Sequence, residues 1–111
     1  MGDHFYGKVR GRVAASSVSG SGGVTTTIAA PADTKRHYSV SGIQTSADVA
    51  CLVTIESPAS TTIWSKRYAA AHAASEKFEL GMVNGAVGQA ILVKTSAGTT
   101  NSEASIQAFL V

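Results

Sequence analysis

The side chains that could serve as a nucleophile, a base or a metal ligand are few and scattered: Cys51, His4, His37 and His72. A zinc site needs histidines at short spacings such as H-x-H or H-E-x-x-H, and neither spacing occurs. A catalytic triad needs Cys51 or a serine beside a histidine and a carboxylate. Cys51 instead alternates with Val53 and Ile55, which predicts a small buried apolar residue. We expect no metal site, no activated thiol and no cofactor.

The acidic residues and the glycine-rich loop give no stronger indication of chemistry. The chain has seven acidic residues, of which Glu76 and Glu79 lie close in sequence, and solvated strand ends explain that pair. Segment 81–88 (GMVNGAVG) contains GxxxGxxG, but it lacks the GK[ST] ending of a phosphate-binding loop and no helical pattern follows it. A wide β-loop is the simpler interpretation. The sequence therefore predicts a protein that is not an enzyme.

Aromatic and basic residues gather in the segment 5–13, where small or apolar residues alternate with polar ones. The residues predicted to make contacts are Phe5, Tyr6, Lys8, Arg10 and Arg12. Cations beside an aromatic ring suit nucleic acid, but the rest of the chain adds no basic stripe, so a nucleic-acid partner is disfavoured. The favoured interpretation is a protein partner reached by strand addition, and a merely solvated strand face is the alternative.

The charge of the whole chain is low and uneven. Charged residues make up 14% of the chain, against about 25% in average proteins. Asp3, Lys8, Arg10 and Arg12 carry the formal net charge of +2, so the remainder is balanced. So little solvating charge favours association with a partner. With one cysteine, no secretory-type apolar stretch and no membrane-spanning segment, we expect synthesis in a reducing compartment and no membrane partner.

The elements that must position these residues are short segments rich in Val, Ile, Thr and aromatic residues. Eight strands are predicted, at 5–13, 24–30, 36–45, 49–56, 62–68, 77–80, 89–95 and 103–111. A bulge is expected at Gly42, where the alternation changes phase. Residues 69–75 are predicted to form a loop or a single helical turn, and Phe78 and Leu80 are predicted to point inward.

Eight short strands without long helices predict an all-β fold, an antiparallel β-sandwich of the jelly-roll kind, with a closed barrel as the alternative. We expect two parts. Residues 1–23 would form a basic arm with a flexible connector at 14–23 (AASSVSGSGG), and residues 24–111 would form the sandwich. A chain of 111 residues is one domain with a thin core, which a partner surface could reinforce.

Residues 30–64, APADTKRHYSVSGIQTSADVACLVTIESPASTTIW, carry a family resemblance. The succession of a Pro-containing turn, "KRHY…GIQ", "VTI" and "TTIW" resembles small β-sandwich virion proteins of tailed bacteriophages. The order continues through Phe78, 85–93 and 106–111, so the likeness covers about residues 24–111. It is closest to the capsid decoration proteins, also called cement or staple proteins, of short-tailed phages of the epsilon-fifteen type. The connection 57–60 (SPAS) departs from the family's Gly-rich turn, and the N-terminal arm lies outside the shared pattern.

The resemblance implies a structural role without catalysis. It implies a protein made in the host cytoplasm that sits on the outer surface of the virion capsid as a homodimer and stabilises the shell by bridging major capsid protein subunits. Two alternatives stay open. One is a host-surface or glycan-binding module, in which Tyr38, Trp64 and Tyr68 would stack on sugar rings, and the other is a head or tail fiber subunit.

Overall fold

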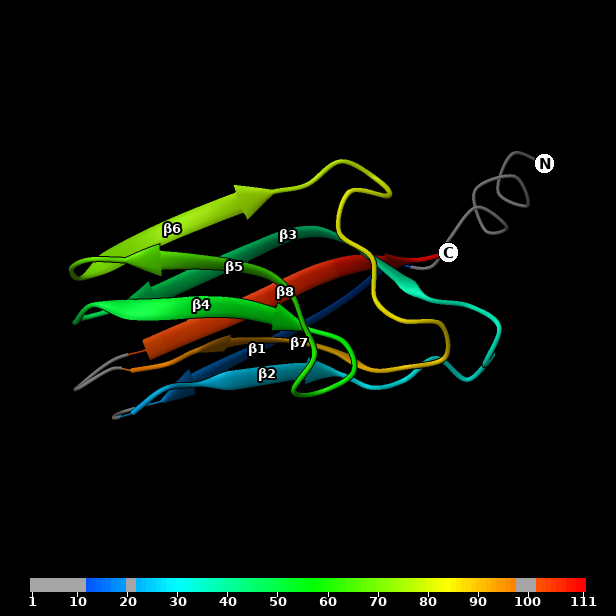
Figure 1. Cartoon of the computed structure of the whole chain (residues 1–111), viewed down its shortest axis with the longest axis horizontal. Coiled ribbons are helices and arrows are strands. Elements are labelled where there is room, and N and C mark those ends of the chain that lie inside the picture. Colours follow the sequence, from blue (N-terminus) through cyan, green and yellow to red (C-terminus); the bar gives the residue numbers. More distant parts are fainter. Residues whose placement is uncertain (1–11, 20–21, 98–101) are drawn as a thin grey trace.

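The computed structural model describes residues 12–19, 22–97 and 102–111, which form eight β-strands (Figure 1). In chain order they are β1 (Arg12–Ser19), β2 (Thr25–Ile28), β3 (Tyr38–Ala47), β4 (Cys51–Glu56), β5 (Thr62–Tyr68), β6 (His72–Lys77), β7 (Ile91–Thr95) and β8 (Ser102–Leu110).

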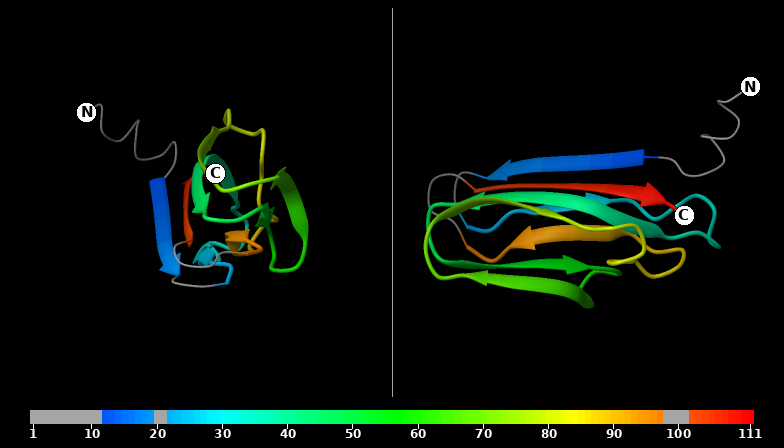
Figure 2. Two further views of the ribbon diagram at one scale, coloured as in Figure 1. Left: turned by 90° about the vertical axis from the view of Figure 1, so that its left-hand side faces the viewer. Right: turned by 90° about the horizontal axis from the view of Figure 1, so that it is seen from above.

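The strands form two four-stranded sheets that pack face to face (Figures 1 and 2). Sheet A has the order β1-β8-β3-β6, sheet B has the order β2-β7-β4-β5, and every strand pair is antiparallel. The chain changes sheet at every connection except the β4–β5 hairpin. This is the strand order of a jelly roll, and the predicted all-β sandwich is confirmed.

The core lies between the sheets and is built from alternate residues of the central strands. Its fully buried large side chains are Val40 and Ile106 from sheet A, and Val53, Ile55, Ile91 and Val93 from sheet B. β-Branched residues favour extended backbone and pack well on a pleated surface, which explains why these segments form strands. The buried hydroxyl of Thr26 in β2 donates to the carbonyl of Ala104 in β8 at 3.1 Å and so links the two sheets.

The expected bulge is present in β3. The pairing of β3 with β8 shifts register between Val40 and Gly42, and Ile43 then returns to the core side at 3% exposure. A Cβ at Gly42 would lie 3.2 Å from the carbonyl oxygen of Glu76 in β6, so the bulge also suits a close approach of that strand. The bulge keeps Tyr38, Val40 and Ile43 on one face of a ten-residue strand.

The expected flexible connector at 14–23 is wrong for residues 14–19, which belong to β1. Strand β1 pairs with β8 over eight consecutive residues, from Arg12 with Phe109 to Ser19 with Ser102. Val13 and Ala15 pack against the core. A run of Ala and Ser has no strand preference of its own, so the sequence indicated a linker, whereas pairing with β8 supplies the backbone hydrogen bonds. The N-terminal part of the predicted arm, residues 1–11, lies outside the described residues.

The sixth strand is also displaced from its predicted place. Residues 72–77, expected mostly as a loop or turn, form β6 and pair with β3 over six residues. The expected strand at 77–80 is absent, and Leu80 is 53% exposed rather than inward. Phe78 is half-buried, with its ring edge-on to Trp64 at 5.4 Å between centroids. The Ala-rich sequence hid the alternation of half-buried and exposed residues along β6.

Candidate protein-contact surface

The predicted contact residues lie at and before the start of β1 in the sequence. Phe5, Tyr6, Lys8 and Arg10 lie outside the described residues, and only Arg12 is described. The Arg12 guanidinium lies over the Phe109 ring, 5.6 Å from its centroid, and donates to the Gln107 side-chain oxygen at 3.4 Å. Arg12 is exposed and opens β1. Its role in contacts stays a prediction.

The fold brings together a thiol and an imidazole that the sequence placed on a strand and in a loop. The Cys51 sulfur lies 3.9 Å from His72 Nδ1, and His72 Nε2 lies 3.0 Å from the Thr45 hydroxyl. The His72 ring also stacks on the Tyr68 ring, with centroids 3.7 Å apart and planes 4° apart. No spacing motif signals this cluster, because its members come from β3, β4, β5 and β6.

The electrostatics of the Cys51–His72 pair oppose activation of the thiol. Burial raises the pKa of Cys51 and lowers the pKa of His72, so both groups are held in their neutral forms. A nucleophilic cysteine needs the reverse, a lowered thiol pKa in an accessible site. Cys51 is 3% exposed. As predicted, Cys51 packs in the core, and the His72 ring covers it.

The aromatic residues considered for sugar stacking have other partners. Tyr38 is buried and its hydroxyl donates to the carbonyl of Ala29 at 2.6 Å. Trp64 packs against Phe78, and Tyr68 stacks on His72 while its hydroxyl donates to Glu76 at 3.3 Å. Each of these three side chains thus has a packing or hydrogen-bonding partner within the chain.

Lys66 lies between Trp64 and Tyr68 in the row of β5 side chains that contact β6 and Phe78. It forms an ion pair with Glu76 at 2.9 Å and lies 5.3 Å from the centroid of the Tyr68 ring. The predicted sharing of one side by Trp64, Tyr68 and Lys66 is confirmed, because Lys66 and Tyr68 contact Glu76 in β6 and Trp64 contacts Phe78, the residue after β6. These contacts join β5, an edge strand of sheet B, to β6, an edge strand of sheet A.

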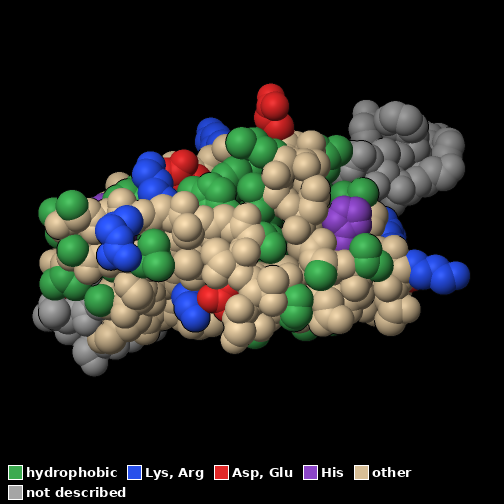
Figure 3. Space-filling view, viewed as in Figure 1, with side chains coloured by type: hydrophobic (Ala, Val, Ile, Leu, Met, Phe, Trp, Pro, Cys, Tyr) green, Lys and Arg blue, Asp and Glu red, His purple; other side chains and the backbone are tan. Residues whose placement is uncertain are grey.

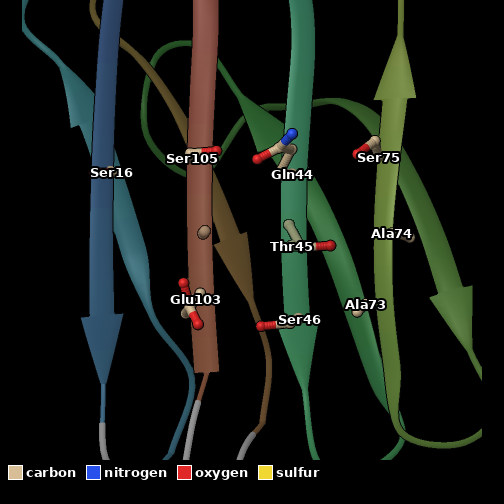
Figure 4. Close-up of a pocket in the computed structure, with 10 residues that line it drawn as sticks. Ser16, Gln44, Thr45, Ser46, Ala73, Ala74, Ser75, Glu103 and Ser105 are labelled. Carbon is tan, nitrogen blue, oxygen red and sulfur yellow. The ribbon is translucent and has the colours of Figure 1, made fainter.

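The outer face of sheet A holds a shallow depression of about 380 Å³ (Figure 4). Four of its lining residues form one cross-strand row, Ser16, Ser105, Gln44 and Ser75, contributed by β1, β8, β3 and β6. Glu103 is the one charged residue that lines it, and no aromatic ring does. The depression is shallow and is lined mostly by small side chains, serines and alanines. Among the described residues, no three histidine, cysteine, aspartate or glutamate side chains gather as metal ligands.

Exposed large apolar residues concentrate in the connection between β6 and β7. Among residues whose burial is described, these are Leu80 (53% exposed), Met82 (65%), Val87 (58%) and the C-terminal Val111 (38%). Apolar side chains are visible over the end of β6 and along the connection that follows it (Figure 3). Scattered exposed apolar residues are common, but three within eight consecutive positions of a low-charge chain are a candidate contact surface.

Two tight turns produce this exposure. Met82 N–H donates to the Glu79 carbonyl at 2.9 Å, and Gly81 at the third position has φ of +85°. Gln89 N–H donates to the Ala86 carbonyl at 3.1 Å, and Gly88 at the third position has φ of +74°. A glycine there is what a type II turn requires, and each turn places an apolar residue, Leu80 or Val87, at its second position.

Hydrogen bonds to the start of β3 hold the segment between the turns. Val40 N–H donates to the Val83 carbonyl at 2.9 Å, Gly85 N–H donates to the Tyr38 carbonyl at 2.7 Å, and Gly88 N–H donates to the Arg36 carbonyl at 2.8 Å. Val83 is buried at 6% exposure. The predicted glycine-spaced loop at 81–88 is confirmed as a loop, and its backbone is anchored like an extra strand segment.

The turns, Val111 and the start of β1 lie at one end of the sandwich (Figure 1). Arg12 pairs with Phe109, and Val111 exchanges backbone hydrogen bonds with His37, so the first described residues and the C-terminus meet there. We call this the loop end, formed by 29–37, 57–61, 78–90 and Val111. Arg12, the first described residue, therefore lies at the loop end.

The described residues contain no helix that is long and apolar enough to cross a membrane. No protein-family model matches the chain. No curated protein matches it either. Among solved structures, the chain is similar to the virus-like particle of the extra small virus of the giant freshwater prawn Macrobrachium rosenbergii, with 14% identity, a TM-score of 0.37, and coverage of 91% of this chain and 77% of that one. At that TM-score the likeness carries no argument for function.

Proposed function

We propose that this protein is a non-enzymatic virion protein that decorates the outer surface of a tailed-phage capsid and stabilises it by bridging major capsid protein subunits. The sequence resemblance of residues 24–111 supplies the protein class. The proposed site of contact with the capsid rests on one observation: Leu80, Met82 and Val87 lie exposed on two anchored turns at the loop end.

The turns are suited to docking because they are already ordered by hydrogen bonds to β3. Apolar side chains on such a backbone lose little conformational freedom when they enter pockets on a partner, so more of the burial energy is retained as affinity. Each contact can be small. When the protein contacts two shell subunits at once, the second contact is effectively intramolecular, and this avidity strengthens its attachment to the shell.

The basic residues of the N-terminal segment belong to the same proposal. Arg12 lies at the loop end, and Lys8 and Arg10 precede it in the sequence. Acidic residues on the shell surface would attract this segment, and salt would weaken that part of the attachment. The partner is therefore a protein surface that combines apolar pockets with acidic residues.

The test is attachment to shells that lack the protein. The triple variant Leu80→Ser, Met82→Ser, Val87→Ser removes the exposed apolar surface without touching the buried anchor Val83. We expect the affinity for shells, measured by co-sedimentation, to fall about 100-fold, because burial of two to three apolar side chains is lost.

The matched control changes three exposed alanines at the opposite end, Ala50→Ser, Ala69→Ser and Ala70→Ser, and should attach as the wild type does. Both variants should give the wild-type circular dichroism spectrum. Unchanged attachment of the loop-end variant, or equal loss in the control, would show that the loop end is not the contact surface.

A further inference from the structure

The four edge strands of the sandwich are not equally protected against pairing with another strand. Each sheet has two edges, which are β1 and β6 in sheet A and β2 and β5 in sheet B. An edge presents unpaired backbone N–H and C=O groups, and proteins normally block it by shortening the strand or by placing charges, prolines or bulges on it. A long, regular and uncharged edge strand is a site for strand addition.

Three edges carry such protection. β2 has only four residues. β5 contains Lys66 and Arg67, and a bulge interrupts its pairing with β4 between Ile55 and Glu56. β6 contains Glu76 and Lys77.

β1 has none of these devices along most of its length. It runs for eight residues, RVAASSVS, in uninterrupted register with β8, and it contains no proline. Its one charge is Arg12, at its first residue. Figure 2 shows β1 as the outermost strand of its sheet, next to β8. Within 12–19, 22–97 and 102–111, no strand pairs with the outer side of β1, and residues 13–19 carry no charge.

We propose that β1 pairs antiparallel with β1 of a second copy of this chain, across a two-fold axis perpendicular to sheet A. Opposite residues in an antiparallel pair share a face, so a register centred on Ala15 sets Ala14 opposite Ser16 of the second copy. These small, uncharged residues oppose each other without a clash of charges. The two Arg12 residues stand at opposite ends of the shared ladder, about 20 Å apart at 3.4 Å per residue.

The second copy suits this edge better than an unrelated strand because the edge is self-complementary in size and charge. The pair would join two four-stranded sheets into one sheet of eight strands. Isologous contacts of this kind close after two copies and do not propagate into fibres.

The antiparallel direction has a consequence for bridging. β1 begins at the loop end, so the two-fold axis directs the loop ends of the two copies in opposite directions. The dimer thus presents one apolar contact surface at each extremity, which lets it touch two shell subunits. The bridging of two shell subunits rests on the proposed function, whereas the pairing of β1 with β1 can be measured without any shell.

The experiment is sedimentation velocity of the purified chain with an edge variant and a matched control. The wild type is expected at twice the 11.3-kDa chain mass. Ala14→Lys with Ser16→Lys changes exposed positions on β1 and sets like charges across the two-fold axis, which should raise the dissociation constant about tenfold or more. Gln44→Lys with Ala73→Lys adds the same charge to exposed positions on β3 and β6, away from β1, and should leave the dimer intact.

A charge-reversal mixture keeps the test independent of folding defects. Ala14→Glu with Ser16→Glu, mixed with the lysine variant, should restore a dimer containing one copy of each. A monomeric wild type, an unaffected edge variant, or a control that dissociates equally would overturn the pairing. The loop-end triple variant should remain dimeric, so loss of attachment with an intact dimer separates a failure of docking from a failure of pairing.

Discussion

Glu56 is the one charged side chain that is buried among the described residues, at 5% exposure. Its carboxylate accepts hydrogen bonds from Lys94 Nζ at 2.9 Å and from the backbone N–H of Ser60 at 2.7 Å. The hydrogen bond from Lys94, then that from Ser60, lowers the pKa of Glu56. One side chain therefore joins β4 to β7 and ties down the connection 57–61 of the loop end.

We expect Glu56→Gln to lower the free energy of unfolding at pH 7 by about 1–2 kcal/mol, because charge-assisted hydrogen bonds are lost while Lys94 stays partly solvated. A lowered folded pKa means that the contribution of Glu56 is complete above its ordinary pKa of 4.5 and is lost as pH falls through the folded pKa. The free energy of unfolding, measured with urea, should therefore fall more steeply between pH 7 and pH 3 in the wild type than in the variant. Parallel pH profiles would contradict this role.

At the scale of elements, the two glycine turns fix where the apolar residues of the loop end point. Gly81 and Gly88 both have positive φ, but a Cβ at Gly81 would meet open space, whereas at Gly88 it would lie 2.8 Å from the carbonyl oxygen of Thr34. The second turn is thus packed against the connection 29–37, whereas the first turn, held by the hydrogen bond from Gly81 N–H to the Ser39 hydroxyl at 2.8 Å, leaves room for a Cβ.

This difference predicts unequal costs for the same substitution. Gly81→Ala should cost about 1–2 kcal/mol of stability, the strain of a left-handed conformation. Gly88→Ala carries the same strain plus the clash with Thr34, so it should cost more and should also weaken attachment to shells. Chemical denaturation and co-sedimentation of the two variants measure this. A larger loss from Gly81→Ala would contradict the described packing.

The elements that the sequence predicted well are those whose alternation is built from β-branched residues. The segment 62–68 matches β5 at both bounds, and 49–56 contains β4 with Cys51, Val53 and Ile55 inward. β1 and β6 were missed because Ala and Ser alternate without a hydropathy contrast, so only their long-range pairing makes them strands.

The contact surface was predictable only in part. Gly81 and Gly88 marked turns in the sequence, but the outward position of Leu80 depends on the end of β6 at Lys77, which alternation alone misplaced. The clustering of His72 with Cys51 depends on strand order in both sheets, and no local spacing encodes it.

At the scale of the whole molecule, the jelly-roll order divides the connections between two unlike ends. The loop end carries the exposed Leu80, Met82, Val87 and Val111. The connections 48–50 and 69–71 at the other end carry exposed alanines and no exposed large apolar residue. The two ends of the molecule therefore differ, and the loop end, with its exposed apolar residues, is the one suited to a partner protein.

The direct test of the central claim is an electron-microscopy map of phage shells decorated with the purified protein. The account predicts density for the sandwich on the outer surface, with the turns at 79–82 and 86–89 of the loop end in contact with the major capsid protein. A map without added density, or one in which the connections 48–50 and 69–71 face the shell while the loop end is free, would contradict it.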